Sequence, residues 1–237
     1  LERSWSRYPS FIPFDLLDKL AEYAGWRPDG VLAGNGSNEI IQALMAVFLR
    51  PGDRIVLPSP TFTVYGLVAT VLGAEPVNVF LNDDMSFDCD ALQKAFLGDD
   101  RAAMIVLCSP NNPTGTLYPL DRLEGLLSQT DRPVVVDEAY YEFAKVSAKD
   151  MLERYDNLIV LRTFSKAFSL AAMRVGYGLM SPELAREVNK AKLPYNIDFF
   201  SIAAAIKLID SRERLQGGID DIIGERDRLI QIGRASC

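Results

Sequence analysis

Short apolar runs recur along the chain and alternate with longer segments in which apolar residues repeat at helical spacing. Several runs are rich in β-branched residues and apolar at consecutive positions, as strands covered on both faces must be. The runs predict seven strands, at Val31–Ala33, Arg54–Pro58, Glu75–Phe80, Met104–Cys108, Pro133–Asp137, Leu158–Arg162 and Val175–Met180.

Helical segments separate these strands. The predicted helices are Ile40–Leu49, Thr61–Leu72, Leu120–Leu127, Pro182–Lys192 and a charged, amphipathic Ile219–Ile232. The fourth of them has Ser181 as its predicted N-cap. Strands that alternate with helices predict an α/β sandwich with a largely parallel sheet. Because ligands of such folds bind at the carboxyl ends of the strands, the residues that follow each strand are the candidates for a site.

The amino-acid composition excludes several classes of catalytic and metal-binding sites. The 237 residues include no histidine, which excludes Ser-His-Asp triads, Cys-His pairs and histidine metal sites. The three cysteines, Cys89, Cys108 and Cys237, fit neither a disulfide framework nor a metal site, and they predict a reducing cytoplasm. A formal net charge of −7 argues against nucleic-acid binding. No apolar run approaches the roughly 20 residues of a membrane span.

The first candidate site lies between the strand at Val31–Ala33 and the helix that follows it. The segment Asn35–Asn38 meets the start of that helix, where free N–H groups and the helix dipole can bind an anion. Gly34 and Gly36 let the backbone approach a phosphate closely. Glu39 stands where a dinucleotide-binding fingerprint has its third glycine, and no P-loop lysine follows. When this segment is considered alone, a capped helix that follows a glycine turn explains it better than an anion site does.

Three further predicted strands are followed by polar side chains. Asn111 and Asn112 lie in a turn constrained by two prolines, and Asp137 ends an apolar strand, where a carboxylate is costly unless it meets a cation or donors. Lys166 stands in an apolar stretch, which favours a neutral, nucleophilic amine. Arg174 could return to the same edge. Each residue alone also fits a plain turn, a helix cap or a solvated surface group.

Together these groups outline one ligand. An anion cradle, an asparagine, an aspartate and a lysine at neighbouring strand ends would fit a phosphate, a positive ring nitrogen and an aldehyde. Pyridoxal 5′-phosphate carries all three, and its enzymes need a lysine that forms a Schiff base and an acidic partner for the pyridinium. The sequence therefore predicts this cofactor and no metal.

A series of motifs supports the same interpretation. In chain order they are Arg7-Tyr-Pro9, Asn35-Gly-Ser-Asn-Glu39, Pro60-Thr-Phe-Thr-Val-Tyr65, Ser109–Gly115, Asp137-Glu-Ala-Tyr140, Thr163-Phe-Ser-Lys-Ala-Phe168 and Arg174-Val-Gly176. The series resembles that of the fold-type I pyridoxal-phosphate aminotransferases, and within them most closely the histidinol-phosphate aminotransferases. The resemblance covers nearly the whole chain and implies a three-layer α/β/α sandwich around a mostly parallel seven-stranded sheet.

The resemblance also implies roles for the residues around the cofactor ring. Lys166 would hold the cofactor as an internal aldimine and, once released by substrate, would move the proton between Cα and C4′. Asp137 would pair with the ring nitrogen. Asn112 and Tyr140 would bind the ring's 3′-oxygen, and Phe62 would stack on the ring, where the family often has tyrosine.

Further roles concern the phosphate and the substrate. The residues implied to bind the phosphate are Gly36, Ser37, Asn38, Thr163, Ser165 and Arg174. Tyr8 resembles a tyrosine that reaches the phosphate of the neighbouring subunit, which implies a homodimer with shared sites. Tyr195 and Asn196 resemble residues that line the substrate side.

The resemblance divides the chain into three parts. Residues 1–13 would be a segment of an N-terminal arm, residues 14–200 the cofactor-binding large domain, and residues 201–237 an interdomain helix region. We expect a small domain, with the arginine that binds the substrate's α-carboxylate, to be missing after this region. The tail Gly233–Cys237 resembles no segment of the family.

The implied activity is the transamination of L-histidinol phosphate with 2-oxoglutarate in histidine biosynthesis. Threonine-phosphate decarboxylation and the transamination of other amino acids share the motifs and remain alternatives. An alternative of another class is a truncated, non-catalytic module that only binds a cofactor or a partner. A nicotinamide-dependent dehydrogenase is disfavoured by Glu39.

Overall fold

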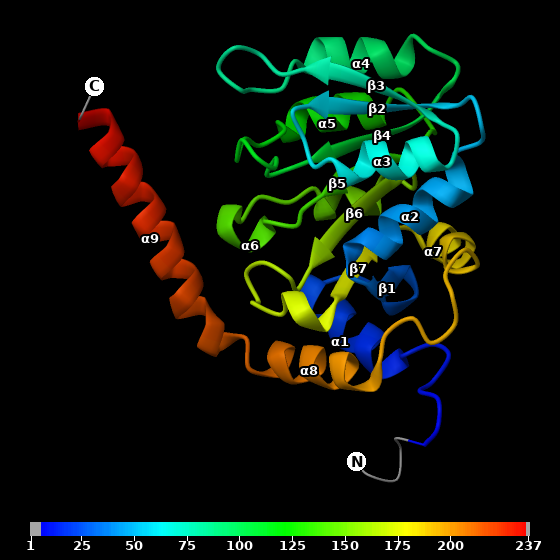
Figure 1. Cartoon of the computed structure of the whole chain (residues 1–237), viewed down its shortest axis with the longest axis vertical. Coiled ribbons are helices and arrows are strands. Elements are labelled where there is room, and N and C mark those ends of the chain that lie inside the picture. Colours follow the sequence, from blue (N-terminus) through cyan, green and yellow to red (C-terminus); the bar gives the residue numbers. More distant parts are fainter. Residues whose placement is uncertain (1–5, 236–237) are drawn as a thin grey trace.

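Seven strands form one sheet in the order β1-β7-β6-β5-β4-β2-β3 in this computed structural model, which describes residues 6–235 (Figure 1). The strands are β1 (Val31–Asn35), β2 (Arg54–Ser59), β3 (Glu75–Phe80), β4 (Ala102–Cys108), β5 (Val134–Asp137), β6 (Leu158–Thr163) and β7 (Val175–Leu179). Only β7 runs against its neighbours, pairing antiparallel with β1 and β6. The predicted α/β fold with a mostly parallel seven-stranded sheet is confirmed.

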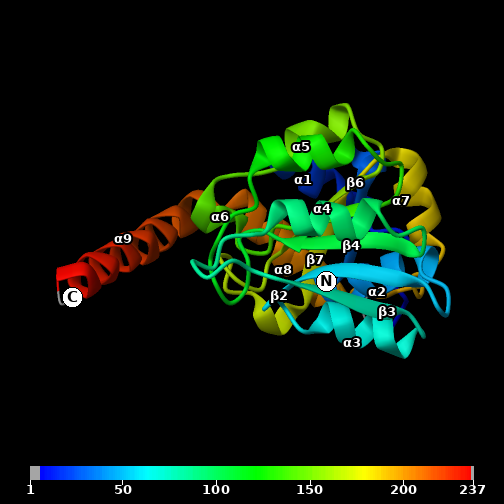
Figure 2. The same cartoon turned by 90° about the horizontal axis from the view of Figure 1, so that it is seen from above.

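Helices cover both faces of the sheet (Figure 2). On one face lie α2 (Ser37–Phe48), α3 (Val64–Val71) and α7 (Pro182–Asn189), and on the other lie α1 (Phe14–Ala24), α4 (Cys89–Leu97), α5 (Leu120–Leu127) and α8 (Phe199–Asp210). The buried side chains accordingly form two cores. Alternation along β5 assigns Val135 to the first core and Val134 and Val136 to the second.

Short helices and one long helix complete the chain. The short ones are η2 (Pro28–Gly30), α6 (Tyr141–Ala144), η3 (Lys149–Glu153) and η4 (Ala171–Met173). The long helix α9 (Glu213–Ala235) extends away from the sheet in both views (Figures 1 and 2). None of the described helices is long and apolar enough to cross a bilayer.

Several predicted boundaries are wrong. The helix after β1 begins at Ser37 rather than Ile40, because the backbone turns at Gly36, where φ is +74°. The next helix begins at Val64 rather than Thr61, since the residues after β2 form a loop toward the strand ends. Ser181 caps α7 as predicted, and its hydroxyl accepts a hydrogen bond from the Leu184 N–H. That helix ends at Asn189, before the expected Lys192.

The pattern predicted none of the short helices and missed three longer ones, α1, α4 and α8, and the last helix is longer than predicted. Of the three, α4 and α8 carry aspartate N-caps, Asp88 and Asp198, whose carboxylates accept backbone N–H groups of the first turn. The final helix begins at Glu213 instead of Ile219. Residues 1–5 of the expected arm segment, and Ser236 and Cys237 of the tail, lie outside the described residues.

Candidate active site

A pocket of about 210 Å³ lies where the carboxyl ends of β2, β4, β5 and β6 meet the start of α2. Parallel strands bring their carboxyl ends to one edge of the sheet, so side chains far apart in the sequence converge there. The lining residues are Ser37, Asn38, Phe62, Tyr65, Cys108, Asn112, Asp137, Ala139, Tyr140, Thr163, Ser165, Lys166, Ala171 and Arg174. Ten of these fourteen are candidates from the sequence; Tyr65, Cys108, Ala139 and Ala171 are not.

One end of the pocket is built to receive an anion. Ser37 and Asn38 present the first turn of α2, and Thr163, Ser165 and Arg174 face them. The Arg174 guanidinium donates to the Ala171 carbonyl at 2.9 Å and to the Ser165 hydroxyl at 3.3 Å. Within residues 6–235, no carboxylate forms an ion pair with this guanidinium, so its charge is available to a ligand.

Two glycines make this close approach possible. The Gly36 N–H donates to the Arg174 carbonyl at 2.7 Å, and a Cβ atom at position 36 would collide with the guanidinium. A Cβ atom at Gly176 would collide with the backbone of Ser37, the first residue of α2. The sequence therefore gives the anion end its shape by leaving out side chains at two positions.

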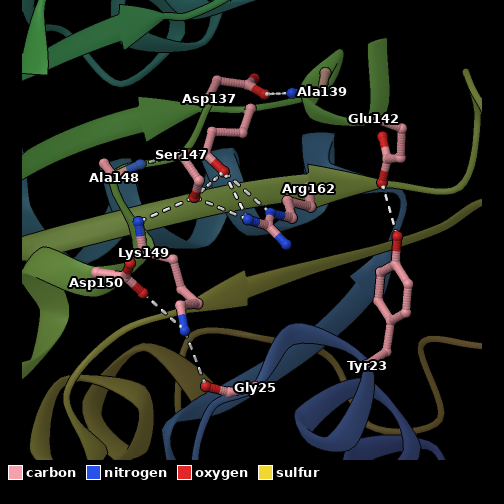
Figure 3. Close-up of polar contacts among 11 residues, drawn as sticks. Tyr23, Gly25, Asp137, Ala139, Glu142, Ser147, Ala148, Lys149, Asp150 and Arg162 are labelled. Carbon is pink, nitrogen blue, oxygen red and sulfur yellow. Dashed lines mark hydrogen bonds and ion pairs between the residues drawn. The ribbon is translucent and has the colours of Figure 1, made fainter. Parts of the chain in front are cut away.

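Asp137 forms the floor of the pocket and is buried. The Tyr65 hydroxyl donates to its Oδ2 at 2.7 Å. The Ala139 N–H donates to Oδ1 at 3.0 Å, as Figure 3 shows. Burial raises the pKa of Asp137 above its ordinary value, while the two donors and the charge of Lys166 lower it. The sequence prediction that this carboxylate meets donors or a cation is confirmed, with neutral donors in direct contact.

Lys166 reaches the pocket from the segment after β6, and its Nζ lies 5.4 Å from the centre of the Tyr140 ring. The interpretation that it lies in apolar surroundings is wrong. Its apolar neighbours Phe164, Ala167 and Phe168 are buried, whereas the lysine side chain is exposed. The prediction that Lys166 lies at a strand end is correct, but the prediction that its amine is desolvated is wrong.

The two asparagines in the turn after β4, Asn111 and Asn112, have different surroundings. Asn112 lines the pocket. Asn111 is buried behind it, where its amide donates to the Pro60 carbonyl at 3.0 Å and its oxygen accepts from the Thr61 hydroxyl at 2.8 Å. These bonds join the loops that follow β2 and β4, so Asn111 supports the walls of the pocket.

Phe62 and Tyr65 come from the same loop and helix start, and their rings meet edge to face with centres 5.5 Å apart. The sequence analysis assigned a role to Phe62 and none to Tyr65. The spacing carried a signal, because Tyr65 and Ala69 lie four residues apart on one face of α3 and both are buried.

Four candidate residues do not line this pocket: Gly36, which lies beside it at the start of α2, and Tyr8, Tyr195 and Asn196. Tyr8 stacks on Tyr195, with ring centres 4.6 Å apart, and its side chain is 80% exposed. Asn196 donates through Nδ2 to the Glu39 carboxylate at 2.6 Å. Through these contacts, the segment between α7 and α8 meets the segment before α1 and the first turn of α2.

Comparison with known proteins gives the family. The family model for aminotransferases of class I and II matches residues 1–232. The histidinol-phosphate aminotransferase of Chlorobaculum tepidum is 36% identical over 95% of this chain, and histidinol-phosphate aminotransferase 1 of Carboxydothermus hydrogenoformans is 40% identical over 96%. The chain spans 65% and 64% of the lengths of these two relatives.

A solved structure agrees with the sequence comparison. The histidinol-phosphate aminotransferase of Sinorhizobium meliloti, determined in complex with pyridoxal 5′-phosphate, superposes with a TM-score of 0.90 at 26% identity. The superposition covers 99% of this chain and 65% of that one. The chain therefore belongs to the class I and II aminotransferase family.

Proposed function

We propose that the protein is a pyridoxal-phosphate-dependent aminotransferase that converts L-histidinol phosphate with 2-oxoglutarate. The observation that carries the proposal is one pocket that holds an exposed amine at Lys166, a buried carboxylate at Asp137 and an anion cradle at the start of α2. The relatives named as histidinol-phosphate aminotransferases support the choice of substrate.

The residues fit the cofactor. The Arg174 guanidinium can lie against the start of α2 because Gly36 has no side chain, and the helix start, two hydroxyls and a guanidinium suit a phosphate. Asp137 is a buried carboxylate without a directly bonded cation in the described chain, which suits a protonated ring nitrogen. Pyridoxal 5′-phosphate supplies an aldehyde that condenses with amines and a protonated ring that withdraws electrons from Cα.

Each side chain then has a task in the proposed reaction. Asp137 would hold the proton on the ring nitrogen, Asn112 and Tyr140 would bind the 3′-oxygen, and Phe62 would cover the ring face. Lys166 would take the proton from Cα of the substrate and deliver it to C4′ of the cofactor, which is general acid–base work in a chain without histidine. Gly36, Ser37, Asn38, Thr163, Ser165 and Arg174 bind the phosphate.

The proposal extends to assembly and location. We propose a homodimer in which Tyr8, exposed in the single chain, binds the phosphate of the neighbouring subunit. Tyr195 lies under Tyr8, so Tyr195 and Asn196 are proposed to face the substrate beside that contact. The proposed location is the cytoplasm.

Trapping the amine tests the cofactor assignment. The protein is mixed with pyridoxal 5′-phosphate, reduced with borohydride and digested, and the modified peptide is identified by mass spectrometry. We expect one modification at Lys166 that Lys166→Ala removes and the control Lys145→Ala, at an exposed lysine of the loop after α6, leaves unchanged. Modification that persists in Lys166→Ala would contradict the assignment.

Product analysis tests the reaction. With L-histidinol phosphate and 2-oxoglutarate, the protein is expected to form glutamate. Release of CO₂ from phosphothreonine would point to the related decarboxylation instead, and neither product would contradict both activities.

A further inference from the structure

We propose that Tyr65 is a positioning residue for the cofactor, which holds the carboxylate of Asp137 ionised and in a fixed orientation through its hydroxyl. The inference rests on the proposed binding of pyridoxal 5′-phosphate in this pocket. It adds a residue that does not itself need to touch the reacting atoms.

The contact between the two side chains is buried and well formed. Tyr65 is 0% exposed, and its hydroxyl donates to Asp137 Oδ2 at 2.7 Å across 72 positions of sequence. The other carboxylate oxygen accepts from the Ala139 N–H at 3.0 Å. One donor on each oxygen fixes the plane of the carboxylate, which a single hydrogen bond would leave free to turn.

The donors on Asp137 are neutral, and this decides what the carboxylate can do. An arginine or lysine in direct contact would satisfy the negative charge, as in a buried ion pair. A hydroxyl and an amide N–H stabilise the charge but leave it for a cationic ligand. Within residues 6–235, no ion pair involves Asp137, so a protonated ring nitrogen would be its first directly bonded cation.

Tyr65 stays a donor because of its surroundings. Burial, together with the charge of Asp137, raises the pKa of the Tyr65 phenol well above its ordinary value. Burial likewise raises the pKa of the neighbouring Cys108 thiol to about 12. Both groups therefore remain protonated near neutral pH, and Asp137 is the acceptor in this cluster.

The position of Tyr65 is fixed from two sides. Its ring meets that of Phe62, the proposed cover of the cofactor ring, and the preceding Thr61 donates to Asn111 at 2.8 Å. One short segment thus sets both the ring face and the carboxylate that faces the ring nitrogen. A change at Tyr65 is expected to act on the ring nitrogen through Asp137.

The test compares Tyr65→Phe with Tyr177→Phe. Tyr177 is an equally buried tyrosine, and its hydroxyl has no hydrogen-bond partner in the described chain. We expect Tyr65→Phe to raise the dissociation constant of pyridoxal 5′-phosphate about tenfold, since a hydrogen bond to a charged group is lost. The nitrogen-15 shift of labelled cofactor should move toward that of a neutral pyridine. Tyr177→Phe should leave both measurements unchanged.

A cofactor analogue separates positioning from a merely structural role. In 1-deazapyridoxal 5′-phosphate a CH group replaces the ring nitrogen, so Asp137 has no proton to hold there. If Tyr65 acts through Asp137, Tyr65→Phe should weaken binding of pyridoxal 5′-phosphate but not of the analogue. Equal weakening of both ligands, as damage to folding would produce, would overturn the inference.

The borohydride and Tyr65→Phe experiments together distinguish a failure of this inference from a failure of the proposed function. If borohydride traps no cofactor on Lys166 of the unaltered protein, the proposed function fails. If the cofactor is trapped and Tyr65→Phe matches the unaltered protein in dissociation constant and nitrogen-15 shift, only the role of Tyr65 fails.

Discussion

The end of β5 separates two regions that treat a buried carboxylate in different ways. Asp137 faces the pocket and has a hydroxyl and an amide as donors. Glu138, the next residue, faces the other side of the sheet and accepts from the guanidinium of Arg162 at 3.0 Å, from the Ser147 hydroxyl at 2.8 Å and from the Ala148 N–H at 2.7 Å. These three donors are labelled in Figure 3. Successive residues of a strand point to opposite faces, so one step along the chain moves from one region to the other.

The difference shows what each carboxylate is for. Glu138 and Arg162 are 1% and 3% exposed, and the guanidinium also lies 3.7 Å from the centre of the Tyr141 ring. A charge satisfied in this way has nothing left for a ligand; it ties the loop between β5 and η3, which carries Tyr140, to β6. Asp137 has no such cation, and its charge is left for the pocket.

Breaking the ion pair should have the largest effect. Glu138→Gln leaves the guanidinium of Arg162 buried without a counter-charge, so we expect the free energy of unfolding to fall by about 3–5 kcal/mol in urea titrations. The double variant Glu138→Met with Arg162→Met removes both charges and should recover much of the loss. A fall below about 1 kcal/mol in the single variant would show that the pair does not anchor the loop.

The two regions also show which features of the site could be predicted from the sequence and which could not. Strand ends were predictable, because buried apolar runs in an α/β pattern determine which residues converge on one edge, and this placed Asp137 and Lys166 in a common pocket. The partners of those residues were not. Tyr65 lies 72 positions from Asp137 and Arg162 lies 24 positions from Glu138, distances at which no spacing rule applies.

The errors have physical causes as well. The apolar stretch around Lys166 suggested a desolvated amine, but the turn after β6 sends the aromatic side chains inward and the lysine outward. The roles proposed for Tyr195 and Asn196 are not among these errors, but the contacts of these residues with Tyr8 and Glu39 join three distant segments. A family resemblance can propose roles for such residues, but local pattern cannot place them.

The next largest effect on stability is expected from the pH dependence of a third buried carboxylate, Glu142. Glu142, on α6 beside the Glu138 region, is buried, and its carboxylate accepts from the Tyr23 hydroxyl at 3.4 Å (Figure 3). Burial raises its pKa to about 7. Because the folded-state pKa lies above the unfolded value, stability is fully present at low pH and is lost as the pH rises from about 4.5 through about 7.

The loss attributable to Glu142 should be about 3 kcal/mol, and Glu142→Gln should remove it. The measurement is the free energy of unfolding at about pH 5 and about pH 8, compared between the two proteins. The matched control Glu153→Gln changes an exposed glutamate of η3 and should leave the pH dependence as it is. An unchanged pH dependence in Glu142→Gln would mean that this carboxylate is not desolvated.

The smallest effect on stability is expected at Glu39, a carboxylate that accepts hydrogen bonds as Glu138 does but is only half-buried. One carboxylate oxygen of Glu39 accepts from the Asn35 N–H and from the Asn196 side chain, both at 2.6 Å, and the Asn35 amide donates back to the Asn196 carbonyl at 3.0 Å. Water can replace the donors of Glu39 because this side chain is half-buried, whereas it cannot reach the buried Glu138. Glu39→Gln should therefore cost only about 1 kcal/mol of stability.

Hydrogen exchange can locate this small effect. Loss of the Glu39 bonds should speed exchange in the segment between α7 and α8, which carries Asn196, while amides of β5 stay protected. Glu187→Gln, on the exposed surface of α7, serves as the control. If Glu39→Gln cost as much stability as Glu138→Gln, the number of donors rather than burial would set the energy of these carboxylates. The contrast between the two sides of β5 would then say nothing about why Asp137 is left for a ligand.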